Sequence, residues 1–258
     1  MNLPNRHIQN LLDCLTRSRL SFALYRLPWT DECYFVLQQS GDVEQLADIR
    51  ELNKKKGFVM APFLQSDHHP LIVIRPDITA YDWDEISEAI SSLECADALL
   101  TCKNQTEKLS PFVSEETDKE RYTQAFERFI TPLQKKHFQK LVLSRSSTKH
   151  INDDFSPLAA FVRACNNYPR MMIYLCHTPV SGTWVGSTPE ILLSGHGKEW
   201  HTVALAGTMP MQNEVMPMDW DKKNQDEQGY VADYIRRIIK KFGNKMNEKG
   251  PYTARAGQ

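Results

Sequence analysis

The stretch WVGSTPEILLSGHGKEWHTVALAGT, residues 184–208, places one carboxylate among the signals of a β-hairpin. Glu190 follows a Gly-Ser-Thr-Pro turn and precedes the apolar run Ile191–Leu193, and a second β-prone run covers Trp200–Leu205. Short β-rich runs separated by turn residues predict a hairpin. The glycine in the closing Ala206–Thr208 turn lets the main chain approach a ligand closely. Taken alone, the stretch favours a surface hairpin with a solvated Glu190, and only motifs elsewhere in the chain favour a functional site.

The composition is typical of a soluble globular protein with one large domain or two small ones. The 258 residues are 41% hydrophobic and 24% charged with a net charge of −1, which offers no basic surface to nucleic acid. No apolar run is long enough to span a bilayer, and the first ten residues lack the apolar core of a signal peptide. The six dispersed cysteines, without a CxxC motif, favour buried free thiols. We therefore expect a cytoplasmic protein without nucleic-acid or membrane partners, and its oligomeric state stays open.

Apolar periodicity predicts an α/β arrangement in the N-terminal part of the chain. The expected elements are a helix through Ile8–Leu15, a helix that begins near Asp82, and strands at residues 21–27, 34–37, 58–63 and 71–74. The polar segment at residues 103–120 contains the best candidate for a domain boundary. We therefore predict an N-terminal α/β subdomain over residues 1–112 and a second domain over residues 113–258.

The second part of the chain alternates helix and strand signals. Thr117 and Glu120 have the spacing of a capping box, which starts a helix. Ser156 and Pro157 start another helix, with proline at the first helical position. Strands are expected at residues 141–145, directly after Lys140, and at residues 171–176.

A later helix carries the most informative side chain of this region. Its apolar stripe runs from Val231 to Phe242 at i, i+3, i+4 spacing, and Gly243 ends it. One turn before Val231 the same stripe contains Glu227. A glutamate on a buried face is unfavourable unless something neutralises it. Two explanations stay open at this point: stabilisation by the helix dipole, or a bound metal ion.

Four motifs in this part of the chain resemble the chorismate-utilising enzyme family, and most closely its isochorismate synthases. They are Lys140–Arg145 (KLVLSR), Gly186–Glu190 (GSTPE), Leu205–Thr208 (LAGT) and Lys223–Glu227 (KNQDE), in the order that the family has them. The resemblance implies an α+β class with the layered chorismate-binding fold of anthranilate synthase component I. It also implies that residues 113–258 form the first half of the catalytic domain. The C-terminal part would then be absent, so we expect this chain, truncated and incomplete, to be inactive by itself.

The resemblance also implies roles for individual residues. Lys140 together with Ala206 matches the water-adding branch of the family, in which water attacks C2 of chorismate while the C4 hydroxyl leaves. Attack needs a base and departure needs an acid. By resemblance, Lys140 is the base and Glu190 the acid. A lysine serves as a base only where its ammonium form is disfavoured, and a carboxylic acid donates at neutral pH only in an apolar setting. Residues Ala206, Gly207 and Thr208 would bind the substrate.

Members of the family use Mg²⁺ to hold a carboxylate of chorismate, and the resemblance makes Glu227 a metal ligand. Gln228 departs from the family pattern, in which histidine follows this glutamate. The expected function is therefore Mg²⁺-dependent conversion of chorismate to isochorismate, for menaquinone or siderophore biosynthesis. Two alternatives stay open: salicylate synthase or another chorismate-utilising enzyme, and a fragment without catalysis.

Overall fold

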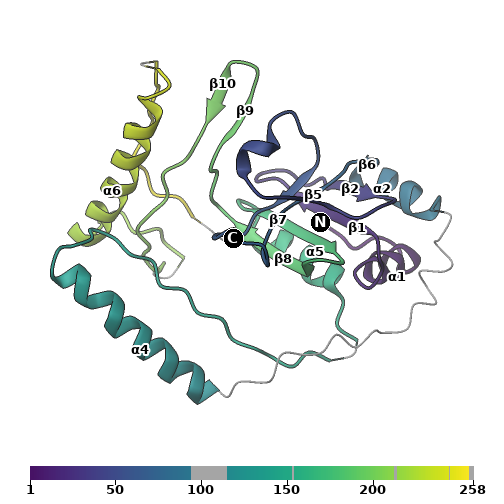
Figure 1. The fold of residues 1–258 in the computed structure, drawn as a ribbon, viewed down its shortest axis with the longest axis horizontal. Helices are drawn as coiled ribbons and strands as arrows, with labels where there is room; N and C mark the ends of the chain where they lie inside the picture. Colours follow the sequence, from purple (N-terminus) through teal and green to yellow (C-terminus); the bar gives the residue numbers. More distant parts are fainter. Residues whose placement is uncertain (94–114, 153, 212–213, 244, 256–258) are drawn as a thin grey trace. The chain divides into compact units, whose positions relative to one another are not determined.

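The computed structural model describes residues 1–93, 115–152, 154–211, 214–243 and 245–255 (Figure 1). The chain divides into two compact units, which we name unit 1 (residues 1–105, 154–189 and 256–258) and unit 2 (residues 106–153 and 190–255). Helices and strands are both present, in agreement with the expected α+β class. Within the described parts, no helix has the length and apolar character needed to cross a membrane. The layered family fold and its incompleteness stay predictions.

Unit 1 is built on two antiparallel sheets. The larger has the strand order β6-β2-β1-β7-β8 and the smaller the order β3-β5-β4. The strands are β1 (Ser21–Arg26), β2 (Tyr34–Gln38), β3 (Glu44–Leu46), β4 (Phe58–Met60), β5 (Leu71–Ile74), β6 (Ile78–Tyr81), β7 (Met172–Thr178) and β8 (Gly182–Thr188). The helices are α1 (Arg6–Leu15), the 3₁₀ helix η1 (Ile49–Leu52), α2 (Asp82–Ser91) and α5 (Pro157–Asn167).

The core of unit 1 lies on both faces of the larger sheet, because successive side chains of a strand point to opposite faces. On β1, Phe22 and Leu24 pack in one cluster with side chains of α1, α2 and α5. Ala23, between them, packs in a second cluster with Ile72 and Ile74 of β5. Helices therefore cover one face of this sheet, and the smaller sheet covers the other.

Local signals place the helices of unit 1 where the sequence predicts them. The Ser156 hydroxyl accepts a hydrogen bond from the Ala159 N–H at 3.0 Å and caps α5. The Asp13 carboxylate accepts from the Leu158 N–H at 3.0 Å, so two of the free N–H groups at this helix start have partners. α2 begins at Asp82, as expected, with Tyr81 as its N-cap.

Three cysteines of unit 1 are buried and form no disulfide, as the sequence predicts. They are Cys33, Cys165 and Cys176. Burial raises the pKa of the Cys33 and Cys176 thiols to about 12, so these groups stay protonated at neutral pH. Cys95 and Cys102 lie outside the described residues.

Unit 2 contains α4 (Glu115–Gln134), α6 (Lys222–Ile239) and a hairpin of β9 (Ser194–His196) and β10 (Glu199–His201). Its packing differs from that of unit 1. Among the residues of unit 2 that the structure describes, Asn224 alone is buried. Large apolar side chains such as Leu192, Trp200 and Met218 are exposed. The order of this unit therefore depends on polar contacts more than on apolar burial.

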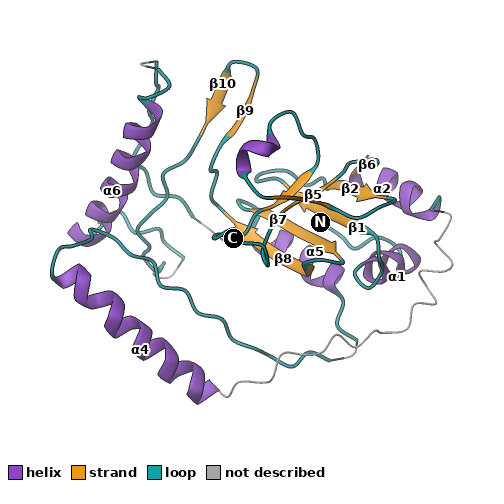
Figure 2. Cartoon of the chain, in the orientation of Figure 1, coloured by secondary structure: helices purple, strands orange, loops and turns teal. Residues whose placement is uncertain are grey.

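Two strand predictions in unit 2 are wrong. Residues 140–150, which include the expected strand at 141–145, form a loop without regular structure (Figure 2). The run Ile191–Leu193 is also not a strand, and the run Trp200–Leu205 is extended only as far as His201. The predicted hairpin exists, but it is formed by residues 194–201. β-prone residues form a strand only where a partner strand accepts their hydrogen bonds, and local composition does not supply that partner.

The apolar stripe of α6 is also less buried than expected. The helix begins at Lys222 and ends at Ile239, before the end expected at Gly243. Tyr234 is 56% exposed and Phe242 is 87% exposed. The stripe thus predicts the helix correctly and its burial incorrectly.

The predicted domain boundary at residues 112 and 113 lies outside the described residues. The larger sheet of unit 1 takes β1, β2 and β6 from before residue 113 and β7 and β8 from after it. The division of the chain at that point stays a prediction.

Candidate functional site

The first two turns of α6 form the framework of the candidate site in unit 2. Asp221 is the N-cap, and its carboxylate accepts from the Asn224 N–H at 2.8 Å and from the Asn224 side-chain amide at 3.1 Å. Both bonds orient Asn224. Its amide oxygen consequently accepts from the Thr208 N–H at 3.1 Å. The start of α6 thus binds the segment Ala206–Thr208, which the family resemblance predicts to bind the substrate.

Three side chains of α6 hold the main chain of residues 204–208. Gln228 accepts from the Ala206 N–H and donates to the Ala204 carbonyl, both at 2.8 Å. The Glu227 carboxylate faces the Gly207 N–H, which helps to lower its pKa. Asn224, Glu227 and Gln228 have the i, i+3, i+4 spacing that places side chains on one face of a helix. We name this arrangement the α6 clamp: Asn224 and Gln228 hydrogen-bonded to the backbone of residues 204–208, with Glu227 between them.

Gly207 is required by the geometry of this segment. Its φ of +73° lies in the left-handed region, which side-chain-bearing residues seldom adopt. A Cβ at this position would lie 3.1 Å from the Asn224 carbonyl oxygen and 3.3 Å from its Oδ1. The glycine therefore permits the close approach of this segment to α6, and its expected close approach to a ligand stays a prediction.

Lys140 and Glu227 form an ion pair within unit 2. Lys140 Nζ donates to Glu227 Oε1 at 2.7 Å, and both side chains are about 30% exposed, at 30% and 29%. Lys223 Nζ lies 3.8 Å from Glu227 Oε2. The hydrogen bond from Lys140 holds the pKa of the Glu227 carboxyl below its ordinary value, and the Gly207 N–H and Lys223 act in the same direction against burial. Glu227 is thus an anion whose charge is balanced by lysine.

Glu190 lies in the coil that follows β8, and its side chain is exposed. An acid that donates a proton at neutral pH needs a setting that disfavours its ionised form, such as an apolar pocket. The exposed position does not provide one. The role of Glu190 as the acid stays a prediction, and so does its opposition to Lys140 across a substrate.

The structure brings together Lys140, Gly207 and Glu227 of the predicted site residues, and the clamp holds Ala206 and Thr208 beside them. Sequence reasoning missed two participants. It gave Asn224 no role and treated Gln228 as a departure from a family pattern. The available signal was the spacing of Glu227 and Gln228 at i+3 and i+4 from Asn224, since such neighbours share one helix face.

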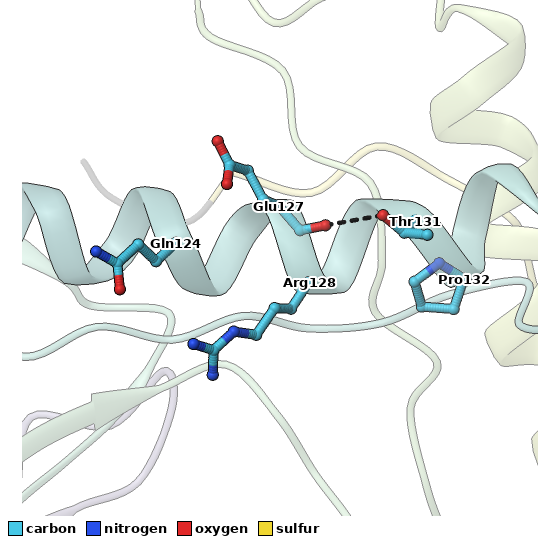
Figure 3. A pocket seen from close by; sticks show the side chains of 5 residues that line it. All are labelled: Gln124, Glu127, Arg128, Thr131 and Pro132. Carbon is cyan, nitrogen blue, oxygen red and sulfur yellow. Dashed lines mark hydrogen bonds between the residues drawn. The ribbon is translucent and has the colours of Figure 1, made fainter.

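A pocket on α4 does not contribute to this site. It is lined by one helix only, through Gln124, Glu127, Arg128, Thr131 and Pro132 (Figure 3). The Thr131 hydroxyl donates to the Glu127 carbonyl at 3.0 Å, within the helix itself. None of the predicted site residues lines the pocket.

The described residues around Glu227 do not supply the set of ligands that Mg²⁺ prefers. This ion favours near-octahedral oxygen ligands, commonly one or two carboxylates with retained waters. Across the described ranges, no three His, Cys, Asp or Glu side chains are grouped so that they could hold a metal ion. Glu227 Oε1 already accepts a hydrogen bond from the Lys140 ammonium. This arrangement does not fit Mg²⁺ as a resident ion, and Glu227 as its ligand stays a prediction from the resemblance.

The Lys140–Glu227 pair predicts an acid-dependent contribution to stability. A carboxyl whose pKa is lowered in the folded state stabilises the fold above its ordinary pKa, near 4.5, and loses that contribution as pH falls through the lowered value. We therefore expect the free energy of unfolding to fall more steeply below about pH 5 for the unaltered chain than for Glu227→Gln. Urea unfolding between pH 3 and pH 7 measures both curves. Parallel curves would contradict the prediction.

Comparison with known proteins adds an independent finding. Residues 49–253 match the model of a protein family described as "Chorismate binding enzyme". The match includes Lys140, Glu190, Gly207 and Glu227. No individual curated protein matches the chain.

Proposed function

Because the chain belongs to the chorismate binding enzymes, we propose that its substrate is chorismate and that the product of its site is isochorismate. One observation carries this proposal: Lys140 donates a hydrogen bond to Glu227, and the Glu227 carboxylate lies beside the Gly207 N–H. Lysine at position 140 and alanine at position 206 resemble the water-adding branch of the family. The pathway that would use the product, menaquinone or siderophore biosynthesis, is proposed only through that resemblance.

In the proposed reaction, a bond forms between a water oxygen and C2 of the ring while the bond from C4 to its hydroxyl breaks. Lys140 takes a proton from the attacking water, and Glu190 gives a proton to the departing hydroxyl, which leaves as water. The double bonds shift within the ring, so the overall change is an isomerisation without oxidation or reduction. General acid and base groups contribute to such a step only when positioned at the reacting atoms.

Two changes from the present arrangement are needed before that step. Lys140 is paired with Glu227 as an ammonium, so it must turn from this carboxylate and lose a proton before its nitrogen can accept one from water. Glu190 is exposed, so it must be covered by the substrate or by protein before it can serve as a proton donor at neutral pH. A Mg²⁺ requirement is a proposal from the resemblance, and no part of the reaction above is assigned to the ion.

A second candidate is binding of chorismate without conversion. It is favoured by the Lys140–Glu227 ion pair and by the scarcity of buried side chains in the described part of unit 2. Positioning accounts for about 7–11 kcal/mol in well-oriented reactions, and a loosely packed site loses much of it. This candidate predicts that binding is detectable while conversion is not.

Incubation of the purified chain with chorismate, with and without Mg²⁺, tests the proposal, beside a relative that forms isochorismate as the positive control. Products are separated by chromatography, and pyruvate is measured in the same samples. Isochorismate alone supports the proposed reaction, whereas salicylate with equimolar pyruvate supports the salicylate synthase alternative. Binding by equilibrium dialysis without any product supports the non-catalytic candidate. Absence of both binding and product would refute the assignment of chorismate as ligand.

A further inference from the structure

We propose that Gln228 is a positioning residue of the chorismate site, because its side-chain amide fixes the main chain of residues 204–206. The inference rests on the proposed function, in which residues Ala206–Thr208 lie against the substrate. Neither the proposed chemistry nor the family resemblance gives Gln228 a role. Its role follows from the contacts that it makes.

The two hydrogen bonds of Gln228 use both halves of one planar group. Its Oε1 accepts from the Ala206 N–H, and its Nε2 donates to the Ala204 carbonyl, each at 2.8 Å. A side-chain amide can satisfy a donor and an acceptor of the same segment at once. Exchange of the two amide atoms would oppose donor to donor and acceptor to acceptor. The orientation of Gln228 is therefore determined by the segment that it holds.

The segment needs these bonds because it has no partner strand. Residues 202–207 are half-buried and lie outside any helix or strand. Backbone N–H and C=O groups removed from water require partners. The clamp supplies them for two amides, with Gln228 on Ala206 and Asn224 on Thr208, and the Gly207 N–H between them faces the Glu227 carboxylate.

Gln228 binds Ala204 and Ala206 at the start of the segment, whereas Asn224 binds Thr208 at its end. Asn224 is itself fixed by Asp221, so the Thr208 end stays attached to α6 when Gln228 is altered. Loss of Gln228 should release Ala204 and Ala206 alone. A displacement of about 1 Å in a positioning element can lower a rate about 100-fold, so release at this end should weaken the site without unfolding the unit.

Three substitutions separate the bonds of Gln228 from its packing. Gln228→Met keeps the length of the side chain and removes both bonds, and Gln228→Glu keeps the acceptor for the Ala206 N–H and removes the donor. Gln225→Met is the matched control, because Gln225 lies on the same helix and donates to the Trp220 carbonyl at 2.6 Å instead. The first readout is amide hydrogen exchange at Ala206 and Thr208, which requires neither substrate nor turnover.

We expect the Ala206 amide to exchange about tenfold faster in Gln228→Met, in keeping with the loss of one hydrogen bond, and to stay protected in Gln228→Glu and Gln225→Met. Thr208 should exchange at the unaltered rate in all three. Unchanged exchange at Ala206 in Gln228→Met, or equal acceleration at Ala206 and Thr208, would overturn the inference, whatever the chorismate affinity of the variant.

The second readout is chorismate affinity by equilibrium dialysis, together with kcat and KM if the chain turns over. Gln228→Met should weaken binding about tenfold, and Gln225→Met should leave it unchanged. If exchange accelerates at Ala206 but affinity and kinetics stay at the unaltered values, Gln228 is structural only and the positioning role is rejected. If the unaltered chain neither binds nor converts chorismate, the proposed function fails, and the role of Gln228 in a chorismate site is rejected with it. The exchange data would still decide whether the clamp exists.

Discussion

Replacing Lys140 by methionine, or Glu190 by glutamine, should lower the rate of isochorismate formation by about 10²–10⁴-fold and leave the fold intact. The magnitude is that of a general base or acid removed from a reaction that needs both. Methionine keeps the aliphatic part of the lysine side chain and removes its nitrogen, whereas glutamine keeps the shape of the carboxyl and removes its proton. The rate is measured from product accumulation at saturating chorismate.

Matched controls for these two substitutions are available in the same unit. Lys136→Met removes an exposed lysine that follows α4, and Glu199→Gln removes an exposed carboxylate in β10. Neither should change the rate by more than about twofold, since surface substitutions away from a site have small effects. If the chain alone forms no isochorismate, the same substitutions are made at the matching positions of the relative that serves as the positive control, and its rate is measured instead. A rate within tenfold of the unaltered enzyme for either Lys140→Met or Glu190→Gln would remove that residue from the proposed mechanism.

Sequence predicts the starts of α2 and α5 because their signals are local, whereas the capping box expected at Thr117 is wrong, since α4 already includes Glu115. Ser156 and Pro157 are adjacent to the helix that they start, and Asp82 stands at the beginning of α2. The strands at 141–145 and 191–193 were predicted from equally local composition and are absent, because a strand depends on a partner elsewhere in the chain. The family match, over residues 49–253, agrees with the resemblance of the four motifs.

The sequence names Lys140 and Glu227 as candidate site residues, but it does not predict the contact between them. Lys140 and Glu227 are 87 positions apart, and no periodicity relates a lysine in a loop to a carboxylate on a helix. Sequence reasoning gave them separate partners, a substrate water and a metal ion. The structure pairs them with each other. Side-chain contacts to a backbone, such as those of Gln228, leave no pattern of apolar residues from which they could be inferred.

The two units differ in what stabilises them, and this difference sets where substitutions act. The three apolar clusters of the described chain all belong to unit 1. In unit 2, contacts such as the α6 clamp and the Lys140–Glu227 pair are polar and partly exposed. Exposed ion pairs contribute about 0–1 kcal/mol each, so single substitutions in the clamp should alter local order more than the total free energy of unfolding.

Replacing Phe161 by alanine should lower the free energy of unfolding of unit 1 by about 3–5 kcal/mol, the range found for large aromatic side chains removed from cores. Phe161 is 0% exposed and packs in the cluster beneath the larger sheet, together with residues of α1, α2, β1 and β7. The loss combines the transfer of the ring from water with the cavity that remains, because neighbouring helices relax only in part.

Phe63→Ala is the control for this substitution, since it removes the same side chain from the same unit at a position that is fully exposed, at 109%. We expect it to change the free energy of unfolding by less than about 0.5 kcal/mol. Urea unfolding followed by circular dichroism, with amide exchange in β1 and β7 as a local readout, measures both variants. Equal effects of the two substitutions would mean that the apolar cluster does not stabilise unit 1. A large effect of Phe63→Ala alone would mean that the residue is covered in solution, so the comparison tests the burial of each phenylalanine separately.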